Sequence, residues 1–181
     1  MNILLFVVSA FGLLAVLAAG SMGQSSVPGG SGVPASPQAG LSDKSAAALR
    51  TVASSNLFEI ESSRLALARS QSTAIKEFAD RMVGDHTRAA NRARQVLGEM
   101  GASLPPLMLE ASHQQKLDAL KAVDNPQFDK AYVEAQYKAH VETVEMFKGY
   151  AQAGEDTRMR AFAAELLPAL QAHLDHVAKL R

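Results

Sequence analysis

The sequence predicts an all-α protein, and three observations support that prediction. From Leu41 onward, apolar residues recur at intervals of three and four, which is the period of an amphipathic helix. No segment alternates apolar and polar residues for long enough to indicate a strand. Alanine supplies much of the hydrophobic fraction of 48%, whereas aromatic residues make up only 6% and tryptophan is absent. Alanine is the strongest helix former, and its small side chain lets helices pack closely.

The composition excludes several functional classes. Lys+Arg and Asp+Glu both number 18, so the formal net charge is zero and we expect no nucleic-acid partner. The chain has no cysteine, which excludes disulfides, a thiol nucleophile, iron–sulfur clusters and cysteine-ligated zinc. No Gly-x-Ser-x-Gly motif occurs, so a nucleophilic hydrolase is the least favoured class. The sequence does not decide whether the protein is an enzyme, but it favours a protein that is not one.

The first forty residues differ in character from the rest. An almost unbroken apolar run extends from Ile3 to Ala19 and is followed by small residues that suit signal peptidase, so residues 1–20 are predicted to be a secretory signal. The alternative is a retained membrane anchor, because the run is about long enough to span a bilayer. Residues 21–40 are rich in Ser, Gly and Pro and uncharged, which predicts a flexible linker. We therefore expect an exported protein of the periplasm or cell envelope, tethered to the membrane if residues 1–20 are retained.

Residues 41–181 are predicted to form one helical domain. Capping residues and helix breakers delimit four long helices, over residues 42–70, 72–100, 125–154 and 156–181. Gly101 suits the position just beyond the second helix. Asn125 is expected to cap the third helix, with Pro126 at its first position. Asp156 is expected to cap the fourth.

The loop lengths predict the topology. The first two helices are joined by a very short turn, as are the last two, so each pair is an antiparallel hairpin. The connection over residues 102–124 is far longer than a bundle turn needs, and we expect a short helix around residues 107–123. A connector of this length can return along the bundle, which predicts a ferritin-like four-helix bundle with a long crossover connection carrying a short extra helix. The alternative is a simple up-down-up-down bundle.

Four polar residues lie among the predicted core positions. His86, His140 and His173 are in line with the apolar stripes of the second, third and fourth helices. The first helix has the apolar stripe Leu49, Ala53, Leu57, Ile60 and Leu67, and beside it the polar edge Asn56, Glu59 and Ser63. At a rise of 1.5 Å per residue, the crossover topology brings Glu59 and the three histidines to about the same level of the bundle.

Three imidazoles and a carboxylate are a suitable ligand set for Zn²⁺, Fe²⁺ or Mn²⁺. Asp85 and Glu142 are candidates for additional or outer ligands, whereas His113 is expected at the surface. Di-iron bundles use two Glu-x-x-His pairs and two further glutamates, and none of the four predicted long helices carries such a pair. The alternative is structural, because a histidine on an apolar stripe is usually a hydrogen-bonded core residue.

Several short motifs stand out along the domain: Phe58-Glu59-Ile60-Glu61, the run from Phe78 to His86, Phe128-Asp129-Lys130-Ala131-Tyr132 followed by His140, and Phe162-Ala163 through to His173-Leu174. These motifs resemble those of a bacterial family of exported proteins, domain-of-unknown-function family 4142. The resemblance covers about residues 44–181. It implies a ferritin-like fold and export, and it carries over Glu59, His86, His140 and His173 as a site, but it implies no established activity.

Two functions from different classes remain compatible with the sequence. One is a metal-binding bundle in the cell envelope, with Fe, Mn or Zn as cofactor, serving metal handling or stress protection. The other is a non-catalytic bundle that acts through surface contacts with an envelope protein, the membrane or a second copy of itself.

Overall fold

The computed structural model describes residues 43–103 and 106–181. These residues form five helices and no strand, which confirms the all-α prediction. The helices are α1 (Asp43–Arg69), α2 (Thr73–Glu99), α3 (Ala111–Ala122), α4 (Asn125–Ala153) and α5 (Thr157–Lys179). The predicted signal (residues 1–20) and linker (residues 21–40) lie outside the described residues.

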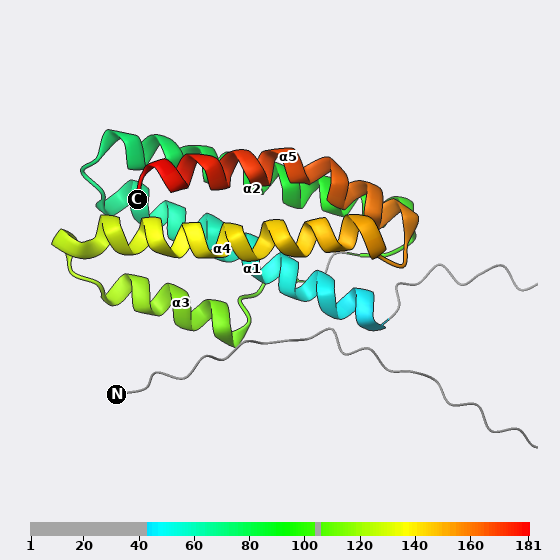
Figure 1. The fold of residues 1–181 in the computed structure, drawn as a ribbon. Coiled ribbons are helices and arrows are strands. Elements are labelled where there is room, and N and C mark those ends of the chain that lie inside the picture. Colours follow the sequence, from blue (N-terminus) through cyan, green and yellow to red (C-terminus); the bar gives the residue numbers. More distant parts are fainter. Residues whose placement is uncertain (1–42, 104–105) are drawn as a thin grey trace, which may run out of the picture. The chain divides into compact units, whose positions relative to one another are not determined.

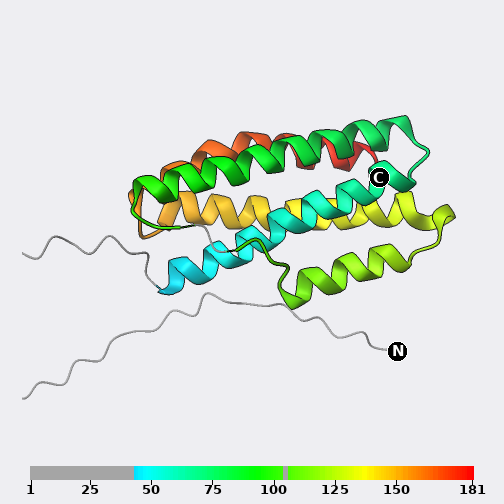
Figure 2. The ribbon, with the colours of Figure 1, turned by 180° about the vertical axis from the view of Figure 1, so that it is seen from behind.

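The two hairpins are joined by a crossover (Figures 1 and 2). α1 pairs with α2 and α4 pairs with α5, in both cases antiparallel. The connection between the hairpins returns along the bundle, so α2 and α4 run in the same direction. α3 is part of this connection and packs against α1 and α4. The predicted crossover is therefore confirmed and the up-down-up-down alternative is wrong, although α3 is shorter than the range predicted for it.

Local sequence explains where the helices end. Gly101 has φ 71°, a left-handed conformation that favours glycine, and it follows the last turn of α2 as predicted. The N–H of Ala102 then donates to the carbonyl of Leu97 at 2.8 Å, which closes a Schellman motif. At the start of α5, the carboxylate of Asp156 accepts hydrogen bonds from the backbone N–H groups of Arg158 (2.8 Å) and Met159 (3.1 Å). α5 continues unbroken through Pro168.

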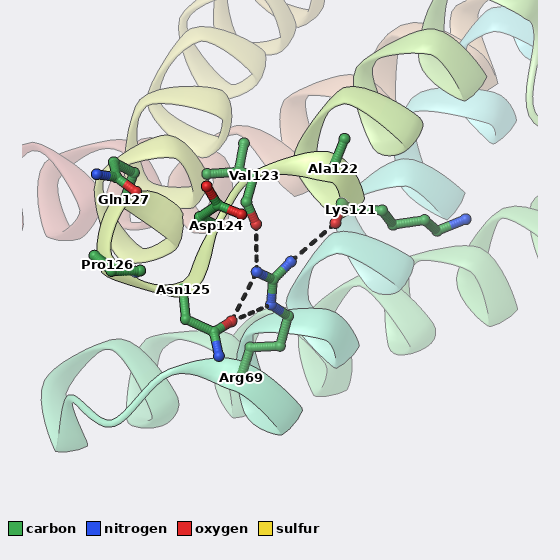
Figure 3. A pocket seen from close by; sticks show the side chains of 8 residues that line it. All are labelled: Arg69, Lys121, Ala122, Val123, Asp124, Asn125, Pro126 and Gln127. Atoms are coloured by element: carbon green, nitrogen blue, oxygen red, sulfur yellow. Dashed lines mark hydrogen bonds between the residues drawn. The ribbon is translucent and has the colours of Figure 1, made fainter.

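Arg69, the last residue of α1, holds the end of the crossover in place (Figure 3). Its guanidinium donates hydrogen bonds to the carbonyls of Lys121, at 3.1 Å, and Val123. It also donates to Oδ1 of Asn125 at 2.8 and 3.0 Å, and it lies 4.2 Å from the ring centroid of Phe128. The end of α1 is thereby joined to the start of α4. The prediction that Asn125 caps α4 is wrong, because Asp124 occupies the N-cap position and the Asn125 side chain bonds Arg69 instead.

Replacing Arg69 by methionine is expected to lower the free energy of unfolding by about 2 kcal/mol. The reason is that the variant leaves several carbonyls of the crossover without their charged donor. Arg64→Met is the matched control, since Arg64 is on the same helix and pairs only with Glu61 one turn away, on the surface. That change should stay within about 0.5 kcal/mol. Urea unfolding of both variants measures the difference, and equal losses would contradict the anchoring role.

The buried face of α1 is more polar than predicted. Only Leu49, Ala53 and Ile60 of the predicted stripe are buried, whereas Leu57 and Leu67 are half-buried. The other buried residues of α1 are Ser54, Phe58, Glu59, Ser62, Ser63 and Ala66. Because α1 contacts α2, α3 and α4, most of its circumference is covered, including the edge predicted to be polar. The core of the bundle therefore contains polar side chains at the level of Glu59.

Candidate metal centre

Three histidines meet in the middle of the bundle, one from each of α2, α4 and α5. One ring nitrogen of each of His86, His140 and His173 lies within 4.8 Å of those of the other two. The ring centroids are 5.5, 5.6 and 5.8 Å apart, so the rings form a nearly equilateral triangle. All three side chains are buried, with His140 only 1% exposed. We call this group the histidine triad.

Each ring of the triad is oriented by one hydrogen bond to an acceptor. Nδ1 of His86 is 3.0 Å from Oδ1 of Asn56, on α1. Nδ1 of His140 is 2.9 Å from the backbone carbonyl of Gln136, one turn earlier on α4. Nε2 of His173 is 2.7 Å from Oδ2 of Asp85. Since all three partners accept, these are the ring nitrogens that carry hydrogen, and the other nitrogen of each ring keeps its lone pair.

Those other nitrogens have no hydrogen-bond partner among the residues that the structure describes. Nε2 of His86, Nε2 of His140 and Nδ1 of His173 are all buried and make no hydrogen bond. Leaving one buried polar atom unsatisfied costs about 1–3 kcal/mol. Metal–imidazole bonds of about 2.0–2.1 Å in tetrahedral geometry place the nitrogens about 3.4 Å apart. The three residues lie close enough together for side-chain movements to bring one nitrogen of each onto a single ion, and the donor set fits a metal.

The environment also keeps the triad in the uncharged form that metal ligation requires. Burial lowers the pKa of His140 to about 4, and the hydrogen bond to the Gln136 carbonyl only partly opposes that. Burial lowers the pKa of His86 well below its usual value, and the two neighbouring imidazoles act in the same direction. Burial also lowers the pKa of His173, against the raising effect of Asp85. At neutral pH all three rings are uncharged, as metal ligation requires.

Glu59 lies next to the triad but outside it. Its side chain is 2% exposed, and Oε1 is 3.9 Å from Nδ1 of His140, the nitrogen that already donates to the Gln136 carbonyl. Burial raises the pKa of Glu59 to about 8. Both groups are therefore uncharged at neutral pH, and their contact is not an ion pair. The structure brings three of the four predicted site residues together and places the fourth beside them as a neutral carboxylic acid.

The other candidates have different surroundings. Asp85 orients His173, which is the position of an outer ligand. Glu142 is exposed and pairs with Lys116 at 3.4 Å, so the prediction that it belongs to the site is wrong. Asn56 and Gln136 had not been singled out as supports of the histidines. The partner at Gln136 is its backbone carbonyl, one helical turn before His140, so this contact depends on the helix and not on the identity of that side chain.

His113 is half-buried, which corrects the expectation of a surface residue. Its Nδ1 shares a hydrogen bond with Oγ of Ser54 at 2.7 Å, and its ring stacks on Phe58 with the centroids 6.0 Å apart. Ser54 Oγ in turn accepts from the backbone N–H of Glu110, at 2.7 Å. Glu110 and His113 form a Glu-x-x-His pair at the start of α3, but their side chains bond Thr51 and Ser54 of α1. The pair therefore attaches α3 to α1 and does not contribute to the triad.

Fold and site together define an all-helical bundle with a buried histidine cluster. The chain belongs to the family described as Domain of unknown function (DUF4142), whose model matches residues 31–180. No curated protein matches the sequence. Two solved structures share the fold, CopM in the Cu(II)-bound form and CopM in the Cu(I)-bound form.

The likeness to CopM extends over most of both chains. For the Cu(II)-bound form the identity is 16% and the TM-score 0.61, and the match covers 74% of this chain and 93% of that one. For the Cu(I)-bound form the values are 17%, 0.60, 77% and 95%. None of the helices over residues 43–103 and 106–181 combines the length and apolar character that a membrane span requires.

Proposed function

We propose that this protein binds one copper ion through the histidine triad and serves metal handling in the cell envelope. The observation that carries the proposal is the convergence of three buried imidazoles from α2, α4 and α5, each with one unpartnered ring nitrogen. A structural role does not account for them, because a structural histidine normally satisfies both ring nitrogens or leaves one in water. A bound ion satisfies all three at once.

The donor set supports copper over the harder metals. Neutral imidazole suits copper and zinc, whereas manganese prefers oxygen ligands and non-haem iron sites combine histidine with carboxylate. The buried carboxyl beside the triad, Glu59, is protonated at neutral pH and is therefore a poor ligand. Both solved structures that share the fold are copper-bound forms of CopM, which favours copper over zinc.

The chain's own residues prepare the site. Asn56, the Gln136 carbonyl and Asp85 each fix one ring so that its free nitrogen is available. The surrounding core buries the triad, since His86, His140 and His173 are at most 7% exposed. Copper would supply only the bonds to nitrogen. This arrangement favours binding and release of an ion over catalysis.

Metal titration of the full chain, purified and stripped with a chelator, tests the proposal. Competition with chromophoric chelators should show one tight site for copper, and the electron paramagnetic resonance spectrum of the Cu(II) form should show coupling to three nitrogens. His176→Ala is the matched control, because His176 lies on the same helix as His173 but packs against Phe78. It should bind copper as the wild type does. Absence of a stoichiometric site would overturn the proposal, and tighter binding of Zn²⁺ would replace copper by zinc.

A further inference from the structure

A cavity of about 370 Å³ adjoins the histidine triad. Its walls come from all four long helices, and they are mainly apolar. Among the lining residues are Val52, Ala93, Phe147, Phe162, Leu166 and Leu170. His86 and His173 also line the cavity, whereas His140 does not. Two of the three residues of the triad therefore border this space.

The charged residues around the cavity neutralise one another. Arg92 of α2 pairs with Glu165 of α5 through Nε at 2.9 Å from Oε1, and a second hydrogen bond of 2.9 Å makes the pair bidentate. Arg88 pairs with Asp85, whose other carboxylate oxygen accepts from His173. No cation or anion among these four lining residues is left without a counter-charge. The cavity therefore favours an uncharged occupant with an apolar body.

The neighbouring triad requires a second property of that occupant, namely a donor atom for a metal ion. Three protein ligands leave one coordination position of a four-coordinate ion open, as in metal sites that bind an exchangeable ligand. Two of the residues that would ligate the ion, His86 and His173, line the cavity, so the cavity adjoins the place that the ion would take. Copper bound by imidazoles accepts a further nitrogen or sulfur donor. A volume of about 370 Å³ is at the lower end of the range for small-molecule sites.

We propose that the cavity holds a small uncharged molecule with an apolar body and one nitrogen or sulfur donor, which occupies the fourth position on the triad-bound copper. This inference rests on the proposed function, since it needs the ion. The donor end meets the metal beside His86 and His173, and the apolar body lies among Phe147, Phe162 and Leu166. The site is thus one for a ligated metal rather than for a bare ion.

Two probes that share a donor but differ in body test the inference on the copper-loaded full chain. Imidazole offers the donor alone, and 4-phenylimidazole adds an apolar ring. Titration followed by the Cu(II) visible and paramagnetic resonance spectra should show 4-phenylimidazole binding about tenfold more tightly or better, because its ring leaves water for the cavity. Binding of 4-phenylimidazole to the metal-free protein should be much weaker. Equal affinities for the two probes, or equal binding with and without copper, would overturn the inference.

Filling the cavity locates the bound ring. Ala93→Leu should remove the advantage of 4-phenylimidazole and leave the imidazole and copper affinities within about twofold of wild type. Ala74→Leu is the matched control, since Ala74 is exposed on the same helix and does not line the cavity. Val52→Phe fills the space from α1 and serves if the first variant does not fold. A retained advantage in a folded cavity-filling variant would overturn the inference. A wild-type chain that binds no copper in the preceding titration would instead overturn the proposed function.

Discussion

Replacing His140 by leucine is expected to abolish tight copper binding and to make the metal-free protein more stable. Nε2 of His140 is buried without a partner, and removing such an atom recovers about 1–3 kcal/mol. Leucine has a similar size and suits an apolar core position, and His140 is only 1% exposed in the wild type. The Gln136 carbonyl that loses the imidazole donor lies inside a helix and keeps its place in the backbone hydrogen-bond ladder.

Thermal unfolding with and without copper measures both effects. Copper at about a thousand times its Kd stabilises a protein by about 4 kcal/mol, which raises the Tm of a domain of this size by roughly 10 °C. That rise should be seen for the wild type and for His176→Leu, and it should be absent from His140→Leu. In urea without metal, His140→Leu should be the more stable protein by about 1 kcal/mol or more. A variant that is less stable without metal, or that keeps the copper-dependent rise, would contradict the account of the triad.

Replacing Glu59 by glutamine is expected to change how stability depends on pH. Burial raises the pKa of Glu59 from 4.5 to about 8 in the folded protein. The folded chain therefore keeps a proton that the unfolded chain releases above pH 4.5. The stability associated with this group is fully present below pH 4.5 and is lost as the pH rises toward 8. One pKa unit corresponds to about 1.4 kcal/mol, so the loss amounts to several kcal/mol.

Glutamine has the same shape and no such titration. The advantage of Glu59→Gln should be near zero below pH 4.5, grow between pH 4.5 and 8, and stay constant above that. Urea unfolding of the metal-free proteins from pH 4 to pH 9 measures it. The lowered pKa values of the triad act in the opposite direction, since their stabilising effect is present above pH 6.5 and lost on acidification. They are common to both proteins and cancel in the difference, so parallel curves would show that Glu59 is not a buried neutral acid.

The topology was predictable because short and long connections have different geometric consequences. Two tight turns require two hairpins, and a connection of more than twenty residues has the length to return along them. Residue counts at 1.5 Å per residue then placed His86, His140 and His173 at one level, and the structure brings their rings together. Their role as ligands stays a prediction.

Other features of the site could not be predicted from the sequence, because they depend on contacts that the periodicity of apolar residues does not reveal. α1 is covered on three sides, so its stripe could not indicate which face is buried. Its serines are acceptable inside because Ser62 Oγ donates to the Phe58 carbonyl of its own helix, at 2.6 Å, and Ser63 bonds the Tyr132 hydroxyl at 2.9 Å. The placement of Glu59 outside the triad depends on side-chain direction, and spacing along a helix determines that only to within one face.

The triad draws its three residues from both hairpins, with His86 on the first and His140 and His173 on the second. An ion held by all three must dissociate before the hairpins can separate, so bound metal would slow unfolding as well as shift its equilibrium. The chain has no cysteine, and a metal cross-link between distant segments would then be its counterpart of a disulfide bridge. The lifetime of the protein against proteases would therefore follow the local supply of copper.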